Sequence, residues 1–292
     1  MLNRRIEKVH EYILPVPTDT TFKYKLDMIE NQQPPSEHLS KTLSEHITKN
    51  INLYPIYDSL HNNLLNKIAD YLNAPFDKKY VNSNNILLTH GSDNALKLIC
   101  ETYNSQEMNV LVLAPTYPHF INFVNLVDHN SIDNLYIDYD ESEDHIFEKI
   151  LDKMDVSKNG GKIYHFVYIS SPNLPIGYCL SSSQIEQLLL THKKCMFVID
   201  EAYIEFSQND SCIKLVNIYD NICITRTFSK FFGIPSLRVG YIITSTKNLA
   251  NIRVSYNGKD VTNIAKIGAL AALESVDYYN KSIDTYNQIK DM

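Results

Sequence analysis

A lysine follows hydroxyl side chains directly after an apolar run. Thr227, Ser229 and Lys230 stand in the stretch Thr-Arg-Thr-Phe-Ser-Lys, and Arg238 follows a little further along the chain. A lysine held beside hydroxyls and a second cation has a lowered pKa, so it can attack a carbonyl and form an imine. Taken singly, such a lysine is more often a solvated surface residue. The residue types alone therefore leave a nucleophile and a surface lysine as alternatives.

A carboxylate closes another apolar run. Asp200 ends the stretch Phe-Val-Ile-Asp, and Tyr203 follows in Asp-Glu-Ala-Tyr. An unpaired charge at the end of a buried strand is energetically unfavourable, so Asp200 requires a cationic partner. A protonated heterocyclic nitrogen of a ligand would serve, and so would a lysine or arginine of the chain. A helix N-cap is a further interpretation.

A third junction has the residues of an anion site. Gly91, Ser92 and Asp93 follow the apolar run 85–89 and open a helical pattern. Gly91 permits close approach of the backbone, Ser92 suits an N-cap, and the free amides of a first helical turn bind phosphate. A capped helix after a turn explains the same residues without any ligand.

Asn173 lies in a rigid turn, Ser-Ser-Pro-Asn-Leu-Pro-Ile-Gly, after the apolar run 163–170. Its side chain is a directed hydrogen-bond donor, although a plain Pro/Gly turn explains the stretch equally well. All of these polar groups come directly after apolar runs. In an open parallel sheet, ligands bind beyond the carboxyl ends of the strands, so we expect these groups to meet at one edge.

The pattern around these junctions predicts an α/β fold, a mostly parallel sheet sandwiched by helices. From about residue 57 to the mid-240s, apolar runs alternate with stretches of helical period, and runs that are apolar throughout are typical of strands buried on both faces. The predicted strands are 110–114, 134–138, 163–170, 195–200, 222–225 and 239–244. The predicted helices are 37–49, 57–72, 93–103, 119–126, 182–191, 248–254 and 261–290.

Three segments differ in character. Residues 1–50 contain scattered prolines and predict an extended arm with one short helix, residues 51–245 carry the alternating pattern of a large domain, and residues 246–292 are helical. The helical pattern reaches Met292 without a capping signal. The chain therefore stops inside a helical pattern.

Composition excludes several classes of protein. The chain has 292 residues and a formal net charge of −7, which disfavours a nucleic-acid-coating protein. With 44% hydrophobic and 21% charged residues, it is an ordinary globular chain. No membrane span or secretory signal is evident, so we expect a cytoplasmic protein without a membrane partner. Its 5 cysteines include no CxxC pair, which predicts buried free thiols and no metal site.

Taken together, the motifs resemble a known family. In chain order they are Tyr54-Pro, Gly91-Ser-Asp, Pro115-Thr-Tyr117, Ser171-Pro-Asn173-x-Pro-x-Gly177, Asp200-Glu-Ala-Tyr203, Thr227-Phe-Ser-Lys230 and Leu237-Arg-Val-Gly240. Their order and intervals are similar to those of the fold-type I aminotransferases, which use pyridoxal 5′-phosphate, and most of all to the histidinol-phosphate aminotransferase branch. The resemblance covers about residues 22 to 285.

The resemblance implies a role for each residue around the cofactor ring. Lys230 would form a Schiff base with the cofactor aldehyde, and Asp200 would pair with the pyridine nitrogen and keep it protonated. Tyr203 and Asn173 would hydrogen-bond the 3′-oxygen, and Tyr117 would stack on the ring. The catalytic residues implied are thus Lys230, Asp200 and Tyr203.

The resemblance also implies the phosphate site and a partner. Ser92, the amide of Asp93, Thr227, Ser229 and Arg238 would surround the cofactor phosphate. Tyr54 would reach the phosphate of a neighbouring subunit, which requires a homodimer. The small-molecule partners would be an amino donor and a keto acceptor, exchanged with Lys230 acting as the base.

The sequence departs from the family pattern at three places. Leu174 and Ile176 replace the second Asn and the Thr of the usual Pro-Asn-Asn-Pro-Thr-Gly turn, which puts local loop contacts in doubt. Ile29 replaces the first Asn of a Leu-x-x-Asn-Glu-Asn segment near the substrate, so we expect a different substrate preference. The family continues into a smaller C-terminal domain, so the resemblance implies that this domain is missing or truncated here. No candidate beyond Arg253 exists for the arginine with which that domain grips a substrate carboxylate.

Three functions are therefore weighed. The first is an aminotransferase acting on an amino acid or a small, perhaps phosphorylated, amine. The second is a decarboxylase of a phosphorylated amino acid, since cofactor motifs do not report which bond at the substrate α-carbon breaks. The third is a cofactor-binding protein without turnover, because a site left open to water by an absent domain lacks a condition for catalysis.

Overall fold

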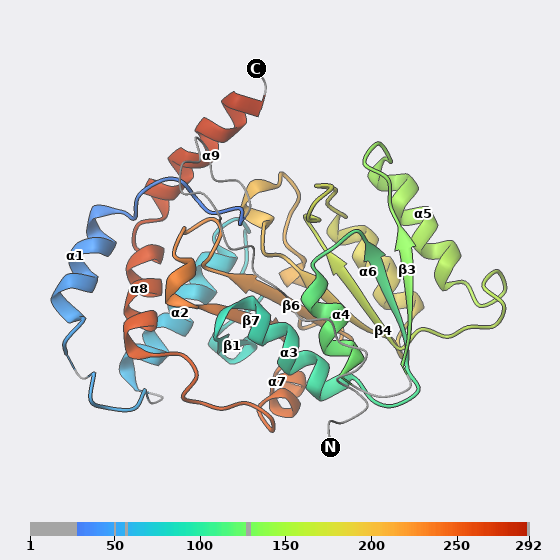
Figure 1. The fold of residues 1–292 in the computed structure, drawn as a ribbon, viewed down its shortest axis with the longest axis horizontal. Helices are drawn as coiled ribbons and strands as arrows, with labels where there is room; N and C mark the ends of the chain where they lie inside the picture. The colour runs from blue at the N-terminus through green and yellow to red at the C-terminus, as the bar shows by residue number, and fades with distance from the viewer. Residues whose placement is uncertain (1–27, 50, 56–57, 127–129, 291–292) are drawn as a thin grey trace, which may run out of the picture.

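The chain folds around one sheet of 7 strands (Figure 1). The structure is a computed structural model that describes residues 28–49, 51–55, 58–126 and 130–290. The strands are β1 (Ile86–Thr89), β2 (Asn109–Ala114), β3 (Ser131–Tyr136), β4 (Phe166–Ser170), β5 (Met196–Asp200), β6 (Ile222–Thr227) and β7 (Gly240–Thr244). Their order across the sheet is β1-β7-β6-β5-β4-β2-β3. All neighbours are parallel except β7, which runs antiparallel to both β1 and β6.

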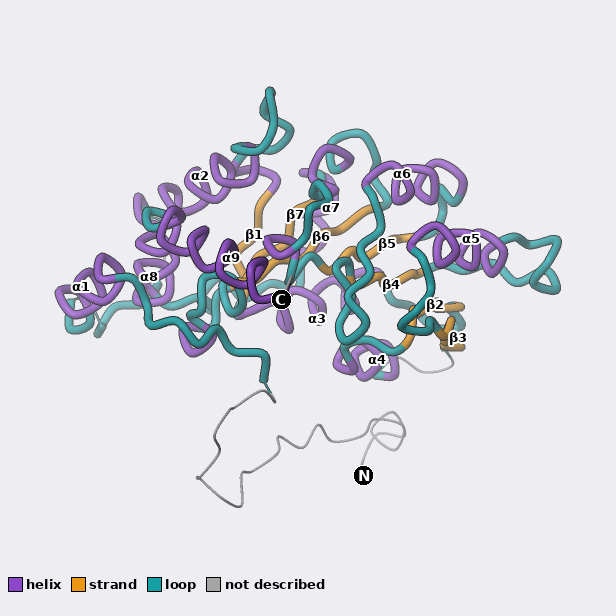
Figure 2. The backbone as a smooth tube through the Cα atoms, turned by 90° about the horizontal axis from the view of Figure 1, so that it is seen from above, coloured by secondary structure: helices purple, strands orange, loops and turns teal. Residues whose placement is uncertain are grey.

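Helices cover both faces of this sheet. They are α1 (Glu37–His46), α2 (Ser59–Asn73), α3 (Gly91–Tyr103), α4 (Pro118–Asn125), α5 (Glu143–Met154), α6 (Ser182–Thr191), α7 (Thr246–Ile252), α8 (Asn263–Leu273) and α9 (Val276–Lys290). Figure 2 shows α3 and α4 on one side of the strands and α2, α5 and α6 on the other. The predicted α/β class with a mostly parallel, helix-covered sheet is confirmed.

The apolar core has two parts, one on each face. The larger part joins α2, α5, α6 and α8 to the sheet, and the smaller part joins α3, α4 and α7 to it. Every residue of β4, β6 and β7 is buried, which explains why β4 and β7 are largely apolar with little alternation. β3 lies at the sheet edge and is partly exposed, and it starts earlier than the predicted strand 134–138.

Local signals explain most helix starts. The Asp58 carboxylate accepts a hydrogen bond from the His61 amide at the start of α2, and Ser181 and Gln184 form a capping box at α6. Tyr57, the predicted first residue of the helix at 57–72, lies outside the described residues. Helix α5, for which the sequence analysis has no prediction, buries Ile146, Ile150 and Met154 at a spacing typical of an amphipathic helix.

The predicted helix at 261–290 is wrong as one continuous element. It is interrupted between Leu273 and Val276, so that α8 and α9 are separate helices. Ser275 in the break donates to the Ala271 carbonyl at 3.0 Å and accepts from Ser36 at 2.9 Å, which ties α9 to the segment before α1. The division into segments 1–50, 51–245 and 246–292 stays a prediction.

Two further expectations concern surface and core chemistry. Each of the 5 cysteines is buried and free, as predicted. In the part of the chain that the structure describes, no helix combines the length and the apolar character needed to cross a bilayer.

The expected extended arm begins with residues 1–27, which lie outside the described residues.

Candidate active site

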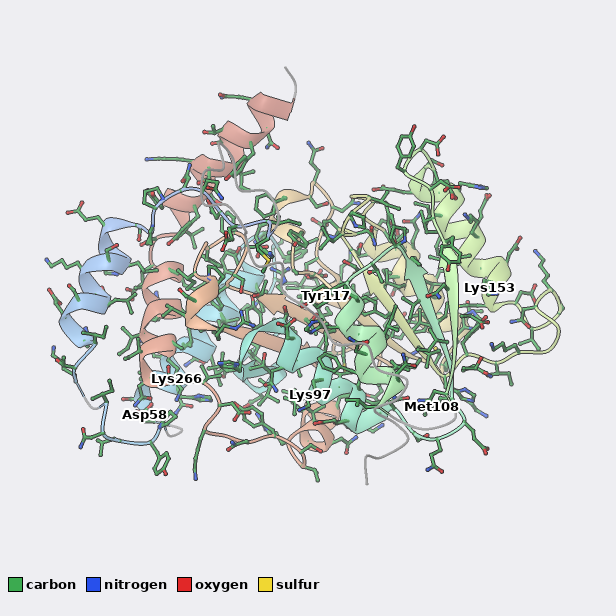
Figure 3. The ribbon with its side chains drawn as sticks, in the orientation of Figure 1. Asp58, Lys97, Met108, Tyr117, Lys153 and Lys266 are labelled. Atoms are coloured by element: carbon green, nitrogen blue, oxygen red, sulfur yellow. The ribbon has the colours of Figure 1, made fainter. Side chains whose placement is uncertain are left out.

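A cavity of about 580 Å³ lies where the carboxyl ends of β4, β5 and β6 meet the start of α3. Nine of the eleven site residues named from the sequence line it: Ser92, Asp93, Tyr117, Asp200, Tyr203, Thr227, Ser229, Lys230 and Arg238. Figure 3 labels Tyr117 near the middle of the molecule, at the start of α4. The expectation that polar groups after the strands would meet at one edge is therefore fulfilled for these residues, but not for Asn173, which does not line the cavity.

Asp200 is buried without a cation. Its side chain accepts hydrogen bonds from the Tyr168 hydroxyl at 2.8 Å and the Thr225 hydroxyl at 2.9 Å, and from the Ala202 amide at 3.2 Å. No lysine or arginine among the described residues forms an ion pair with it. Burial raises the pKa of Asp200 above its usual value, against the lowering effect of these hydrogen bonds.

Lys230 lines the same cavity as Asp200. Its Nζ donates to the backbone carbonyls of Met28 at 2.9 Å and Ile29 at 3.3 Å, and lies 5.6 Å from the centroid of the Tyr203 ring. Desolvation lowers the pKa of Lys230, and the carboxylates of Glu30 and Asp93 oppose this effect. Lys230 lines the cavity and is half-buried, so it is not the solvated surface lysine of the alternative interpretation.

Arg238 and the start of α3 form a basic, amide-rich end of the cavity. Arg238 contacts the Asp93 carboxylate at 3.1 Å, and the Tyr117 hydroxyl donates to the same carboxylate at 2.6 Å. A Cβ on Gly91 would lie 2.5 Å from the Arg238 side chain, and a Cβ on Gly240 would lie 2.6 Å from the Ser92 amide nitrogen. Only glycines therefore let helix, arginine and strand approach this closely.

The interpretation of Ser92 as an N-cap is wrong. Helix α3 starts at Gly91, and His90 occupies the cap position without a side-chain hydrogen bond. Ser92 instead stands in the first turn and lines the cavity. This leaves amides at the N-terminus of α3 without a side-chain cap, which is the arrangement that suits an anion.

Asn173 and Tyr54 lie apart from the other named residues. The Asn173 amide donates to the Pro115 carbonyl at 3.2 Å, and its oxygen accepts from the Ile176 amide at 3.0 Å, within its own turn. Tyr54 is 75% exposed, and Lys259 lies over its ring. Neither lines the cavity, so their expected roles stay predictions.

Sequence reasoning missed residues that support the site. Tyr168 and Thr225 hold Asp200, yet neither was expected to do so. The register of the sheet pairs Ser170 with Asp200 and Asp200 with Thr225, so period-two alternation along β4 brings Tyr168 to the same face. Strand pairing, which one sequence does not reveal, was the information needed to find them.

The chain was compared with known proteins. The family model for aminotransferase class I and II matches residues 24–290. The chain belongs to this family. Members use pyridoxal 5′-phosphate, so the chain is a pyridoxal-phosphate-dependent aminotransferase.

Individual relatives agree with this assignment. A dihydroxyacetone phosphate transaminase of Campylobacter jejuni is 32% identical over 97% of this chain and 74% of the relative. A histidinol-phosphate aminotransferase of Brachyspira hyodysenteriae is 28% identical over 91% of this chain and 71% of the relative. The predicted similarity to the histidinol-phosphate aminotransferase branch is thus confirmed.

Solved structures show the same fold at lower identity. The histidinol-phosphate aminotransferase of Sinorhizobium meliloti, solved with pyridoxal 5′-phosphate, aligns with a TM-score of 0.73 at 20% identity, over 88% of this chain and 65% of that one. The aspartate aminotransferase of Thermotoga maritima aligns with a TM-score of 0.71 at 19% identity, over 90% of this chain and 69% of that one.

We predict that Asp200→Asn stabilises the cofactor-free protein at pH 8. The raised pKa means that the ionised carboxylate is less favourable in the folded state. Stability is therefore lost as pH rises from the unfolded-state pKa, about 3.9, through the folded-state value. Removing a buried charge without a cation should gain about 1 to 3 kcal/mol, a gain that disappears towards pH 4. Urea unfolding at several pH values measures it.

Asp133→Asn is the matched control for this prediction. Asp133 is paired with Lys162 at 2.8 Å and accepts from Tyr164, so its ionised form is stabilised in the folded state. The substitution there should destabilise the protein at pH 8. An Asp200→Asn protein that is no more stable than wild type at pH 8 would contradict the unfavourable burial of Asp200.

Proposed function

We propose that the cavity around Lys230 and Asp200 is the transamination site of this aminotransferase. The observation that carries the proposal is that Asp200 is only 5% exposed, lines the cavity, and accepts hydrogen bonds solely from neutral donors among the described residues. A protonated pyridine nitrogen would supply the missing cation. Lys230 lines the same cavity and would attach the cofactor aldehyde.

The rest of the cavity fits the remaining parts of the cofactor. Arg238 and the α3 amides would hold the phosphate, together with the hydroxyl groups of Ser92, Thr227 and Ser229. Thr227 and Ser229 already hydrogen-bond each other at 3.0 Å, so both hydroxyls are fixed at this end of the cavity. Tyr117 would cover the ring, and Tyr203 would contact the 3′-oxygen with Asn173.

The chain's own groups would move the proton. When bound, pyridoxal 5′-phosphate supplies an electron-withdrawing ring that stabilises the charge left on the substrate α-carbon when its proton departs. Nζ of Lys230 would take that proton, and its lowered pKa favours the neutral amine that a base requires. Asp200, held by Tyr168 and Thr225, would keep its charge directed at the ring nitrogen.

We infer that the substrate is a small phosphorylated molecule. Both named relatives act, by their names, on phosphorylated compounds: dihydroxyacetone phosphate and histidinol phosphate. The amino donor would be a small amine or amino acid. The same site would catalyse decarboxylation only if a substrate placed its carboxylate bond, instead of its α-hydrogen, perpendicular to the ring.

A homodimer in the cytoplasm completes the proposal. Tyr54 is exposed and lies outside its own cavity, as expected of a residue that serves the site of a second copy. Ile47, Ile51 and Leu53 nearby are also more than half exposed, at 52%, 70% and 58%, and would be covered by that copy. The small-molecule chemistry of the family supports a cytoplasmic location.

We predict that Lys230→Ala abolishes the visible absorption that the wild-type protein acquires with pyridoxal 5′-phosphate. Loss of the amine removes the covalent attachment, while the fold stays intact because Lys230 is only half-buried. Lys247→Ala, at a 71% exposed lysine paired with Asp220, is the control and should keep the band. Persistence of the band in Lys230→Ala would assign the attachment to another amine.

The reaction itself is tested with substrates. Dihydroxyacetone phosphate or histidinol phosphate should exchange an amino group with an amino-acid partner in ping-pong kinetics. The absorption of the loaded protein should convert to that of the amine form with the donor alone. Release of carbon dioxide instead would identify a decarboxylase, and an unchanged spectrum with every donor would argue for cofactor binding without turnover.

Co-expression of two variants, each defective in cofactor binding, tests the proposed dimer. Tyr54→Ala should weaken binding of the cofactor by about tenfold, because one hydrogen bond to a charged phosphate is lost. Co-expression with Lys230→Ala should restore high-affinity binding at one site of each mixed dimer, since that site has Lys230 from one subunit and Tyr54 from the other. Mixed preparations that bind no better than Tyr54→Ala alone would rule out the shared site.

A further inference from the structure

A buried ion cluster lies directly behind the proposed cofactor site. Nε and Nη2 of Arg226 both contact the Glu201 carboxylate at 2.9 Å, and Nη1 contacts Glu205 at 3.4 Å. The side chains of Arg226 and Glu201 are only 7% and 1% exposed. Among the ion pairs of the described residues, this cluster alone has all its members so deeply buried.

Alternation along the strands places this cluster on the opposite face of the sheet from Asp200. Asp200 and Thr225 are register partners on the cavity side, where their side chains hydrogen-bond. Arg226 follows Thr225 within β6. Glu201 comes directly after the last residue of β5, and its amide donates to the Thr225 carbonyl at 2.9 Å, so the side chains of Glu201 and Arg226 meet on the other face. The ends of β5 and β6 are thus joined on both faces.

Arg226 contacts both ends of the segment that carries Tyr203. Glu201 precedes Tyr203, and Glu205 follows it in the short helix Ile204–Phe206. Glu201 is fixed further by the Ser211 hydroxyl and the Cys212 amide, both at 2.7 Å, and Glu205 accepts from the Tyr71 hydroxyl at 3.2 Å. The segment 201–205 is therefore tied to Arg226 at both ends.

The two joined loops supply different halves of the cofactor site. The loop after β5 contributes Asp200 and Tyr203, and the loop after β6 contributes Thr227, Ser229 and Lys230. Resting on the function proposed above, we propose that Arg226 is a positioning residue that sets the distance and orientation between these halves. It would act through Glu201 and Glu205 without touching the cofactor.

A contribution to the stability of the fold does not explain why Arg226, Glu201 and Glu205 are buried together. Burying charges is costly, and apolar residues of similar volume often replace a buried ion pair with no loss of stability. Arg226 also has two carboxylates for one guanidinium, and burial raises the pKa of Glu205. A fixed geometry between the two loops is what a planar guanidinium with several directed N–H donors provides and an apolar contact does not.

The test measures two properties of the protein with pyridoxal 5′-phosphate. The first is its affinity for the cofactor, from an absorption titration, and the second is the pH midpoint of the bound cofactor's visible band. Arg226→Met should weaken the affinity by about tenfold and shift the midpoint, because Tyr203 and Lys230 lose their fixed relation. Arg226→Lys, which can contact one carboxylate well, should recover part of the affinity. Glu205→Gln, nearly the same in shape, should show a smaller loss with the same shift.

Asn73→Ala is the matched control. Asn73 is buried at the end of α2, away from the cavity, and bonds the carbonyls of Ala69 and Val81 at 2.6 and 2.8 Å. This variant should lose thermal stability yet keep wild-type affinity and midpoint, which separates positioning from general destabilisation.

Distinct outcomes decide between the two proposals. Folded Arg226→Met with wild-type affinity and an unchanged midpoint would overturn the positioning role, as would an equal loss of affinity in Asn73→Ala. Should Arg226→Met fail to fold, Arg226→Lys and Glu205→Gln decide by the same criteria. A wild-type protein without any Lys230-dependent band would instead overturn the proposed cofactor site.

Discussion

The site depends on one unfavourable arrangement, a buried carboxylate that forms no ion pair with any lysine or arginine in the described part of the chain. Asp200 ends a strand that is buried along almost its whole length, and its partners are two hydroxyls and an amide. Neutral donors fix the orientation of the carboxylate but leave its charge available. A lysine or arginine placed beside the Asp200 carboxylate would stabilise the folded protein. It would also occupy the space that the protonated ring of a cofactor would take.

The two faces of the sheet serve different purposes around the buried Asp200 carboxylate: one face forms the cavity, and the other holds the strand ends together. On the cavity face, Asp200 and Thr225 leave room for a ligand. On the opposite face, Glu201 and Arg226 from the adjacent positions form a buried ion pair. Because successive side chains of a strand point in opposite directions, residues next to each other in sequence can hold the frame and serve the site without competing for space.

The sequence predicted the fold class, the placement of six strands and nine of the cavity-lining residues, because these follow from local signals. Apolar runs, turns and polar residues after strands are all visible along one chain. What it missed depends on pairing between distant segments: the antiparallel direction of β7, the hydroxyl of Tyr168 beneath Asp200, and the contact of Arg226 with Glu205. The break between α8 and α9 was missed for a related reason, since Ser275 is held by a residue before α1.

Ile29 shows how the surroundings can hold a residue in an unsuitable conformation. Its φ of +50° is a region that asparagine tolerates and that β-branched side chains avoid, at a cost of about 1 to 2 kcal/mol. The resembled family has asparagine at this point of the pattern. The segment keeps its shape here because Lys230 donates to the carbonyls of Met28 and Ile29, and Asn31 donates to the Phe231 carbonyl at 3.0 Å. The left-handed backbone conformation beside Lys230 is therefore retained, although isoleucine replaces the asparagine that suits it better. This indicates that the cavity requires the backbone conformation at position 29 more than a particular side chain there.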